Sequence, residues 1–329
     1  MRRREFVTSL AGAALALSGG ASARADRRVR RIGFQSNLTE GDAEAQLYVA
    51  AFEQTLNQLG WSKGRNLDIA YRWTAGDPAA IRRTAAELVA MNPDLILTVG
   101  GSQVKPLQDL TSTIAILFVQ TVDPVGADFV DSLSRPGRNA TGFSVFDFGI
   151  GAKWLELLRQ LAPNIRRVAV LREPNTPSGP AVLASVQAAA PGSRMEVSSI
   201  SLRDADAITN AITAFAREPG GGLVVAPNSR AIVNRATIIA LAERFRLPAI
   251  YPFRLFVVDG GLLYYGPDVV SQYRQAASYA DRILRGESPA DLPVQGPSRY
   301  ELTINLRAAK AIGIEVPDSL SVSADALIE

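Results

Sequence analysis

Short polar clusters follow the apolar runs of this chain, and their residue types suit the binding of a small polar solute. The clusters are Ser36 and Asn37; Gly101, Ser102 and Gln103; Thr121 and Asp123; Glu173, Asn175 and Ser178; Asn228 and Ser229; and Arg254. Hydroxyl and amide groups both donate and accept hydrogen bonds. The cluster 101–103 precedes a helical segment, so its free N–H groups and the helix dipole would favour an anion such as a carboxylate.

Each of these residues also has an ordinary structural explanation. Ser, Thr and Asn before a helix are most often N-caps. Asp123-Pro124 suits a turn, and Arg254 suits a surface cation. Tyr251 and Tyr265 are candidates for stacking on a flat ligand, with a packed core position as the alternative. The binding interpretation therefore depends on all the clusters meeting at one place.

The composition excludes much of hydrolase chemistry. The chain contains no His and no Cys, which removes Ser-His and Cys-His pairs, the usual zinc ligands and all disulfides. The glycines at 100 and 101 lack the spacing of a dinucleotide fingerprint, and Gly142-Phe-Ser144 lacks the closing glycine of a nucleophile elbow. We expect no catalytic residue, metal or cofactor. An enzyme would need a carboxylate pair or Ser/Lys chemistry.

Strand-like and helix-like segments alternate along the chain in two similar series. In the first series the expected strands are 31–34, 67–73, 94–99 and 114–119, and the expected helices are 43–59 and 78–91. In the second, the strands are 168–171, 195–202, 223–226 and 249–251, and the helices are 181–190, 205–217 and 232–245. Such alternation predicts two lobes with parallel sheets covered by helices. The polar clusters then lie at the carboxyl ends of strands, where α/β proteins bind ligands.

The first twenty-five residues are typical of an export signal. Three arginines at 2–4 precede an apolar run and the stretch Ala23-Arg24-Ala25. Arg3-Arg4-Glu5-Phe6 fits a twin-arginine signal, with the general secretory route as the alternative. The signal holds four arginines and one glutamate, so 31 basic and 31 acidic residues remain of the 35 and 32 in the chain. We expect an exported, soluble periplasmic protein without a lipid anchor and without affinity for nucleic acid or membrane.

Several longer stretches, taken in order, resemble the solute-binding proteins of ABC transporters, in the family that includes aromatic amino-acid binding members. They are 123–126, 132–137, 139–143, 153–158, 166–171, 247–251, 259–266, 279–284, 290–294, 301–306, 309–313 and 324–329. The resemblance implies a type I periplasmic binding protein: an α/β fold of two Rossmann-like lobes joined by a hinge. Lobe one would comprise 26–142 and about 268–295. Lobe two would comprise 143–267, and the tail 296–329 is placed with it, although the sequence leaves its packing open.

We expect a clamp that closes on a small ligand and delivers it to a permease and its ATPase, and a monomer is the default for such a mobile clamp. A receptor that signals to a sensor kinase is the alternative. One residue departs from the amino-acid binding pattern, because Asn228 occupies a loop where relatives tend to carry an acid for the ligand's ammonium. Either Glu173 or Asp268 supplies that charge, or the ligand is not an α-amino acid. We expect a small polar ligand that bears a carboxylate and is aromatic or amino-acid-like; an uncharged or purely anionic molecule, including an aromatic acid, stays open.

Overall fold

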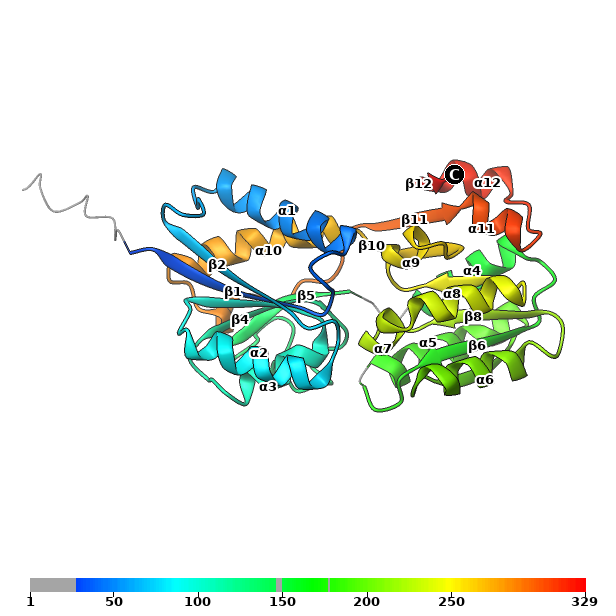
Figure 1. Ribbon diagram of the computed structural model, residues 1–329, viewed down its shortest axis with the longest axis horizontal. Helices are drawn as coiled ribbons and strands as arrows, with labels where there is room; N and C mark the ends of the chain where they lie inside the picture. Colours follow the sequence, from blue (N-terminus) through cyan, green and yellow to red (C-terminus); the bar gives the residue numbers. More distant parts are fainter. Residues whose placement is uncertain (1–27, 146–149, 177) are drawn as a thin grey trace, which may run out of the picture.

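The chain forms two sheets, one of five and one of seven strands, which lie in two lobes side by side (Figure 1). The computed structural model describes residues 28–145, 150–176 and 178–329. The predicted export signal at 1–25 lies outside these residues. None of the described helices is both long and apolar enough to cross a bilayer.

The first sheet is parallel throughout, in the order β2-β1-β3-β4-β5. Its strands are β1 (Arg30–Ser36), β2 (Leu67–Trp73), β3 (Leu95–Val99), β4 (Ala115–Thr121) and β5 (Ala140–Ser144). Helices α1 (Ala43–Gln58) and α10 (Val269–Leu284) cover one face, and α2 (Pro78–Ala90) and α3 (Val104–Gln108) cover the other (Figure 1). Strands β3 and β4 are buried along their whole length, as expected for parallel strands covered on both faces.

The second sheet has the order β12-β11-β10-β9-β8-β6-β7, and its one antiparallel pair is β10 with β11. Its strands are β6 (Arg167–Arg172), β7 (Glu196–Ser201), β8 (Gly221–Val225), β9 (Ala249–Tyr251), β10 (Leu263–Pro267), β11 (Tyr300–Asn305) and β12 (Ala326–Ile328). Its helices are α4 (Ile150–Leu161), α5 (Ser178–Ser193), α6 (Ala205–Phe215), α7 (Ser229–Val233), α8 (Arg235–Arg244), α9 (Arg254–Val258), α11 (Leu306–Ala311) and α12 (Asp318–Ser323). Apolar side chains of α4 and α5 pack on one face, and those of α6, α8 and α9 pack on the other.

The chain passes between the lobes three times: between β5 and α4, between β10 and α10, and between Gln295 and β11. Helix α10 packs against α1 in the first lobe. The backbone carbonyl of Gln295 then accepts a hydrogen bond from the N–H of Ser144 at 2.8 Å, and β11 returns to pair with β10. Three connections therefore join the two sheets.

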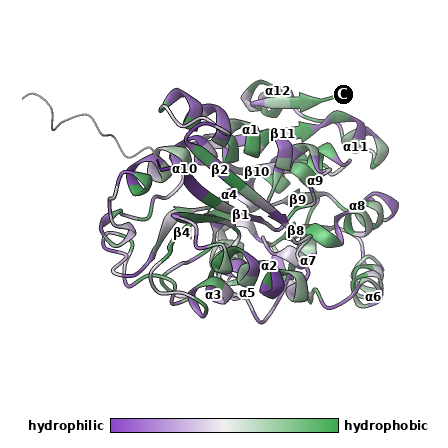
Figure 2. Cartoon of the chain, turned by 60° about the vertical axis from the view of Figure 1, so that its left-hand side comes forward, coloured by the Kyte–Doolittle hydropathy of each residue, from purple (hydrophilic) through white to green (hydrophobic). Residues whose placement is uncertain are grey.

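Apolar residues gather on the sheets and the inner helix faces, while polar residues cover the outer surface (Figure 2). Aspartates cap helices in both lobes: Asp42 caps α1 in the first, and Asp204 caps α6 in the second. Two expectations need correction. The helix expected at 232–245 is two helices that meet at Asn234, whose backbone is not helical, and the helix expected at 181–190 begins earlier, at Ser178.

Candidate functional site

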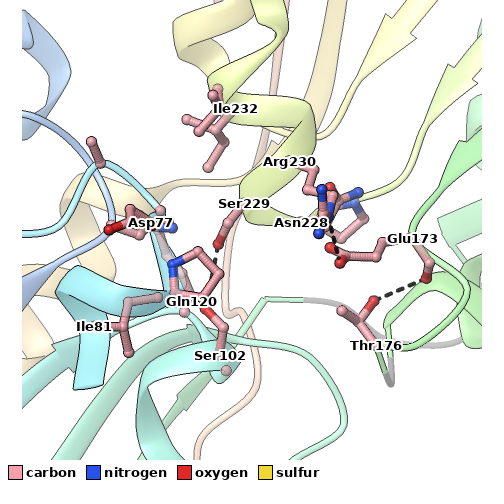
Figure 3. A pocket seen from close by; sticks show the side chains of 18 of the residues that line it. Asp77, Ile81, Ser102, Gln120, Glu173, Thr176, Asn228, Ser229, Arg230 and Ile232 are labelled. Carbon is pink, nitrogen blue, oxygen red and sulfur yellow. Dashed lines mark hydrogen bonds and ion pairs between the residues drawn. The ribbon is translucent and has the colours of Figure 1, made fainter. Parts of the chain in front are cut away.

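A cavity of about 500 Å³ lies between the lobes, within the range of roughly 300–1,000 Å³ that is usual for small-molecule sites. Figure 3 shows residues of both lobes pointing into it. The first lobe supplies the polar side chains of Asn37, Asp77, Arg82, Ser102 and Gln120. The second lobe supplies those of Glu173, Thr176, Asn228, Ser229, Arg230 and Asn234. The apolar lining includes Pro78, Ile81, Pro106, Ile232, Val233 and Phe253.

The cavity lies where strand ends of the two sheets face each other. Asn37 directly follows β1, and Gly101 and Ser102 follow β3. Glu173 follows β6, and Asn228 follows β8. Since every one of these strands is parallel to its neighbours, their carboxyl ends meet at the same edge of each sheet.

Helix starts present hydrogen-bond donors to this cavity. The cluster 101–103, expected to open a helix, forms a 3-10 turn, η1 (Gly101–Gln103), that leads into α3. Among the described residues, no acceptor bonds the backbone N–H groups of Gly101 and Ser102. Asn228 caps α7: its Oδ1 accepts from the N–H of Ala231 at 2.7 Å, and its Nδ2 donates to the carbonyl of Ala226 at 2.8 Å.

The two carboxylates of the described lining already have partners. Asp77 caps α2, and its Oδ2 accepts from the N–H of Ala80 at 2.8 Å. Glu173 forms an ion pair with Arg230 at 2.8 Å (Figure 3). Arg82, on the second turn of α2, forms no ion pair with any described carboxylate. The lining therefore offers free hydrogen-bond donors, whereas both of its carboxylates already have partners.

Asn37 is a buried polar residue that still has hydrogen-bonding capacity. Its side chain is 6% exposed, and its Oδ1 has no partner among the described residues. A Cβ at Gly100, whose φ is +85°, would lie 3.2 Å from Asn37 Nδ2. Glycine at this position therefore leaves room for the amide beside the start of η1. Because an unsatisfied buried polar atom is costly, this oxygen is a natural acceptor for a ligand.

The lobes touch each other beside the cavity. The hydroxyls of Ser102 and Ser229 lie 3.3 Å apart (Figure 3). Gly76 has a φ of +70°, and a Cβ there would lie 3.1 Å from the Cβ of Ser229. The two lobes are therefore in contact at this edge of the cavity.

Comparison with known proteins assigns this chain to a family. The model for the ABC transporter substrate binding protein family matches residues 36–328. The chain belongs to that family. A tyrosine-binding protein of Clostridioides difficile (strain R20291) is 25% identical over 265 residues, which cover 80% of this chain and 76% of that protein.

Solved structures of such proteins share the fold. A Streptococcus pneumoniae domain in complex with L-Trp superposes with a TM-score of 0.83 at 21% identity, covering 91% of this chain and 99% of that one. A ligand-free, open substrate binding protein with adhesive properties from Clostridium difficile gives 0.68 at 22% identity, with the same coverage. The predicted family and the two-lobe type I periplasmic binding protein fold are confirmed.

Six of the residues expected at the ligand line the cavity of this family member: Asn37, Gly101, Ser102, Glu173, Asn228 and Ser229. Four other expected residues, Ser36, Gln103, Thr121 and Ser178, are buried and do not line it. For Ser36 and Thr121 the cause is the alternation of extended backbone, in which successive side chains point to opposite sides. Asn37 faces the cavity while Ser36 accepts from the N–H of Leu38, and Gln120 and Val122 face it instead of Thr121.

Three further residues that were expected at the ligand do not line the cavity. Asp123 forms a turn, in which its Oδ1 accepts from the N–H of Gly126 at 2.9 Å. Asn175 is exposed and does not line the cavity. Asp268, considered as the partner of a ligand ammonium, caps α10 and bonds the N–H of Ser271 at 2.9 Å.

The two tyrosines expected to stack on a ligand pack inside the second lobe instead. Tyr251 is 1% exposed and stacks on Phe256, with ring centroids 5.1 Å apart. Tyr265 stacks on Tyr300 at 5.6 Å. The aromatic residue that does line the cavity among the described residues is Phe253, just after β9.

Arg254 is committed to an ion pair that bridges the lobes. Its guanidinium contacts Oε1 of Glu44, on the first turn of α1, at 2.5 Å. Next to this pair, Arg235 of α8 lies 3.3 Å from Asp42 and 2.5 Å from Asp259. The arginine expected to meet the ligand therefore holds one lobe to the other.

Sequence reasoning missed the segment 75–82, which follows β2 and contributes Gly76, Asp77, Ile81 and Arg82. A signal for it exists, because Asp77-Pro78 after a strand is an N-cap followed by a proline at the first helical position. Among the described residues, no cluster of His, Cys, Asp or Glu is arranged to hold a metal ion.

Proposed function

We propose that this chain is an exported solute-binding protein that closes its two lobes on one small ligand and presents it to an ABC permease. The observation that carries the proposal is the cavity of about 500 Å³ formed jointly by strand ends of both lobes, in a chain of the substrate binding protein family. Asn37, Gly101 and Ser102 would bind from lobe one. Asn228 and Ser229 would bind from lobe two, with Glu173 paired to Arg230.

The lining supports a ligand that has a carboxylate and an apolar or aromatic body. Free N–H groups at the start of η1 and the hydroxyls of Ser102 and Ser229 are suitable donors to a carboxylate. Ile81, Ile232 and Phe253 offer apolar contact to the rest of the molecule. The names of a tyrosine-binding relative and of an L-Trp complex favour aromatic, amino-acid-like ligands.

Binding alone, without catalysis, is the proposed activity. The chain has neither His nor Cys, and the two carboxylates of the described lining are held by a helix start and by Arg230. Closing would work through contacts made only in the closed state, because a ligand shifts a conformational equilibrium only by its differential affinity. The short distances between Ser102, Ser229 and Gly76 support such contacts.

The remaining parts of the proposal come from the sequence. The protein would reach the periplasm through its signal at 1–25, would carry no lipid anchor and would act as a monomer. Lobe one would comprise 26–142 and about 268–295, and lobe two 143–267 and 296–329. Its partners would be the permease and ATPase of one importer.

The test is mass spectrometry of small molecules released from the gently purified protein, followed by thermal unfolding with each released compound. We expect one stoichiometric solute that raises the Tm, because a ligand of the native state stabilises it by mass action. An Asn37→Ala variant should lose the solute, whereas Arg307→Gln, an exposed change on α11, should retain it. A protein that releases nothing and shows no Tm shift with amino acids, aromatic acids, sugars or nucleobases would refute the binding role.

A further inference from the structure

An α-amino acid brings an ammonium group into a closed cavity, and a buried cation is tolerated only when it is paired with a negative group. The described lining contains two carboxylates, Asp77 and Glu173. Whether either is free to meet an ammonium decides which class of ligand fits.

Asp77 is engaged by its own helix. Its Oδ2 accepts from the N–H of Ala80 at 2.8 Å, and its Oδ1 accepts from the N–H of Ala79 at 3.4 Å. Its negative charge lies at the positive end of the α2 dipole, which stabilises it there. An ammonium that drew Asp77 away would uncap the thirteen-residue helix that lines the cavity.

Glu173 is engaged by a cation of its own lobe. Its Oε1 accepts from Nε of Arg230 at 2.8 Å, while another nitrogen of Arg230 donates to the carbonyl of Arg203. The guanidinium is therefore held from two sides. An ammonium next to Glu173 would face Arg230 as well, and one negative group would serve two cations.

Apart from the cations Arg82 and Arg230, the remaining polar side chains of the lining are neutral, and at the loop after β8 Asn228 offers no negative charge. Its Oδ1 caps α7, and its Nδ2 bonds the carbonyl of Ala226. Unengaged donors, in contrast, are present: the N–H groups of Gly101 and Ser102, and the guanidinium of Arg82, which has no carboxylate partner among the described residues. These groups suit an anion.

The side chain of Asn37, beside the start of η1, provides a second and independent observation. The buried amide of Asn37 lines the cavity with its Oδ1 unpartnered. A neutral O–H or ring N–H of the ligand would satisfy it without adding charge.

We propose, on the basis of the proposed function, that the ligand is a monocarboxylate with an aromatic or apolar body and a neutral hydroxyl or ring N–H, and without an α-ammonium. Its carboxylate would lie at the N–H groups of Gly101 and Ser102. The ring or chain would lie against Ile81, Ile232 and Phe253. The chain would thus be specific for aryl-alkanoic acids in a family with amino-acid binding relatives.

The experiment is calorimetric titration with ligand pairs that differ only in the amine. The probes are hydroxyphenylpropionate against L-tyrosine, and indolepropionate against L-tryptophan. We expect the amine-free member of at least one pair to bind tenfold or more tightly than its amino acid. Tighter binding of the amino acids would overturn the inference while leaving the proposed binding role intact. The inference would also be overturned if no pair bound and the protein released a solute of another class.

An Asn228→Asp variant makes the test sharper. Aspartate caps a helix as well as asparagine does, so α7 keeps its cap; the bond from Nδ2 to the Ala226 carbonyl is lost, and a negative charge is added to the lining. We expect the preference to move at least tenfold toward the amino acid in each pair. Asn66→Asp, at a half-buried position before β2 where Asn66 accepts from the N–H of Ser62, is the control for net charge and should not move the preference. A preference unchanged by Asn228→Asp would refute the role assigned to this loop.

Discussion

The ion pair between Glu44 and Arg254 should set how readily the lobes close, and replacing either residue tests this directly. Glu44 belongs to lobe one and Arg254 to lobe two, and their charged atoms lie 2.5 Å apart. The glutamate side chain is 7% exposed, whereas the arginine side chain is 32% exposed. The hydroxyl of Tyr48 also donates to the glutamate, at 2.9 Å.

The unequal burial of the two partners predicts unequal effects. Arg254→Gln leaves a buried carboxylate without its cation, a change that costs about 3–5 kcal/mol in a fully buried pair. Partial exposure of the arginine, and the hydration that Glu44 regains when the lobes open, reduce this to roughly 2 kcal/mol against the closed state. That is about a 30-fold weaker ligand affinity. Glu44→Gln leaves an arginine that water already reaches, so we expect roughly 1 kcal/mol, or about fivefold.

The assay is calorimetric titration with the co-purified ligand, together with small-angle scattering of the ligand-free protein. Arg254→Gln should weaken binding and increase the radius of gyration of the ligand-free protein. Arg299→Gln breaks a pair with Asp325 that lies within lobe two, so it should change neither quantity. Equal losses from Arg254→Gln and Glu44→Gln, or an unchanged affinity in both, would refute this reasoning.

Three further predictions concern closure, pH and packing. Gly76→Ala should weaken ligand binding, because the new Cβ would lie 3.1 Å from Ser229 of the other lobe. The control is Gly64→Ala, which has a similar φ of +78° but open space around it. It should lower the unfolding free energy, measured by chemical denaturation, by only about 1 kcal/mol. Burial, and then nearby carboxylates, raise the pKa of Glu301 to about 7, so the folded state holds a proton that the unfolded state has lost. The unfolding free energy should therefore fall as pH rises from about 5 through 7, and Glu301→Gln should remove that part of the slope. Trp154→Phe should lower the unfolding free energy, measured by denaturation, by about 2 kcal/mol. The substitution removes the indole N–H that donates to the Tyr265 carbonyl of β10 at 2.7 Å, and it leaves a void.

Much of the fold could be predicted because its signals are local. The strand at 67–73 and the helix start at Pro78 depend on alternating side chains and on a cap followed by proline, which neighbouring residues determine. The break at Asn234 was not predictable in this way. The apolar periodicity continues across it, and the start of α7 is determined by the Asn228 cap.

Residues at the ends of the strands show which part of the cavity lining can be predicted from the sequence. Asn37 and Asn228 were placed correctly at the cavity because they follow buried parallel strands, whose order in the chain is visible. Thr121 was not, because the choice between it and its neighbours depends on the direction in which the last strand residues point. Gln120, with a positive φ of 55°, takes the cavity position.

The sequence by itself determined the alternation of strands and helices and the lack of His and Cys, and it predicted an export signal and the edge of the sheets at which the cavity lies. Only the tertiary structure decided which charges are free. Arg254 meets a glutamate 210 residues away, Glu173 meets Arg230, and Tyr251 stacks inside the core. The physical reason is that charge pairing and ring packing depend on distances between segments remote in the chain, which local periodicity does not encode.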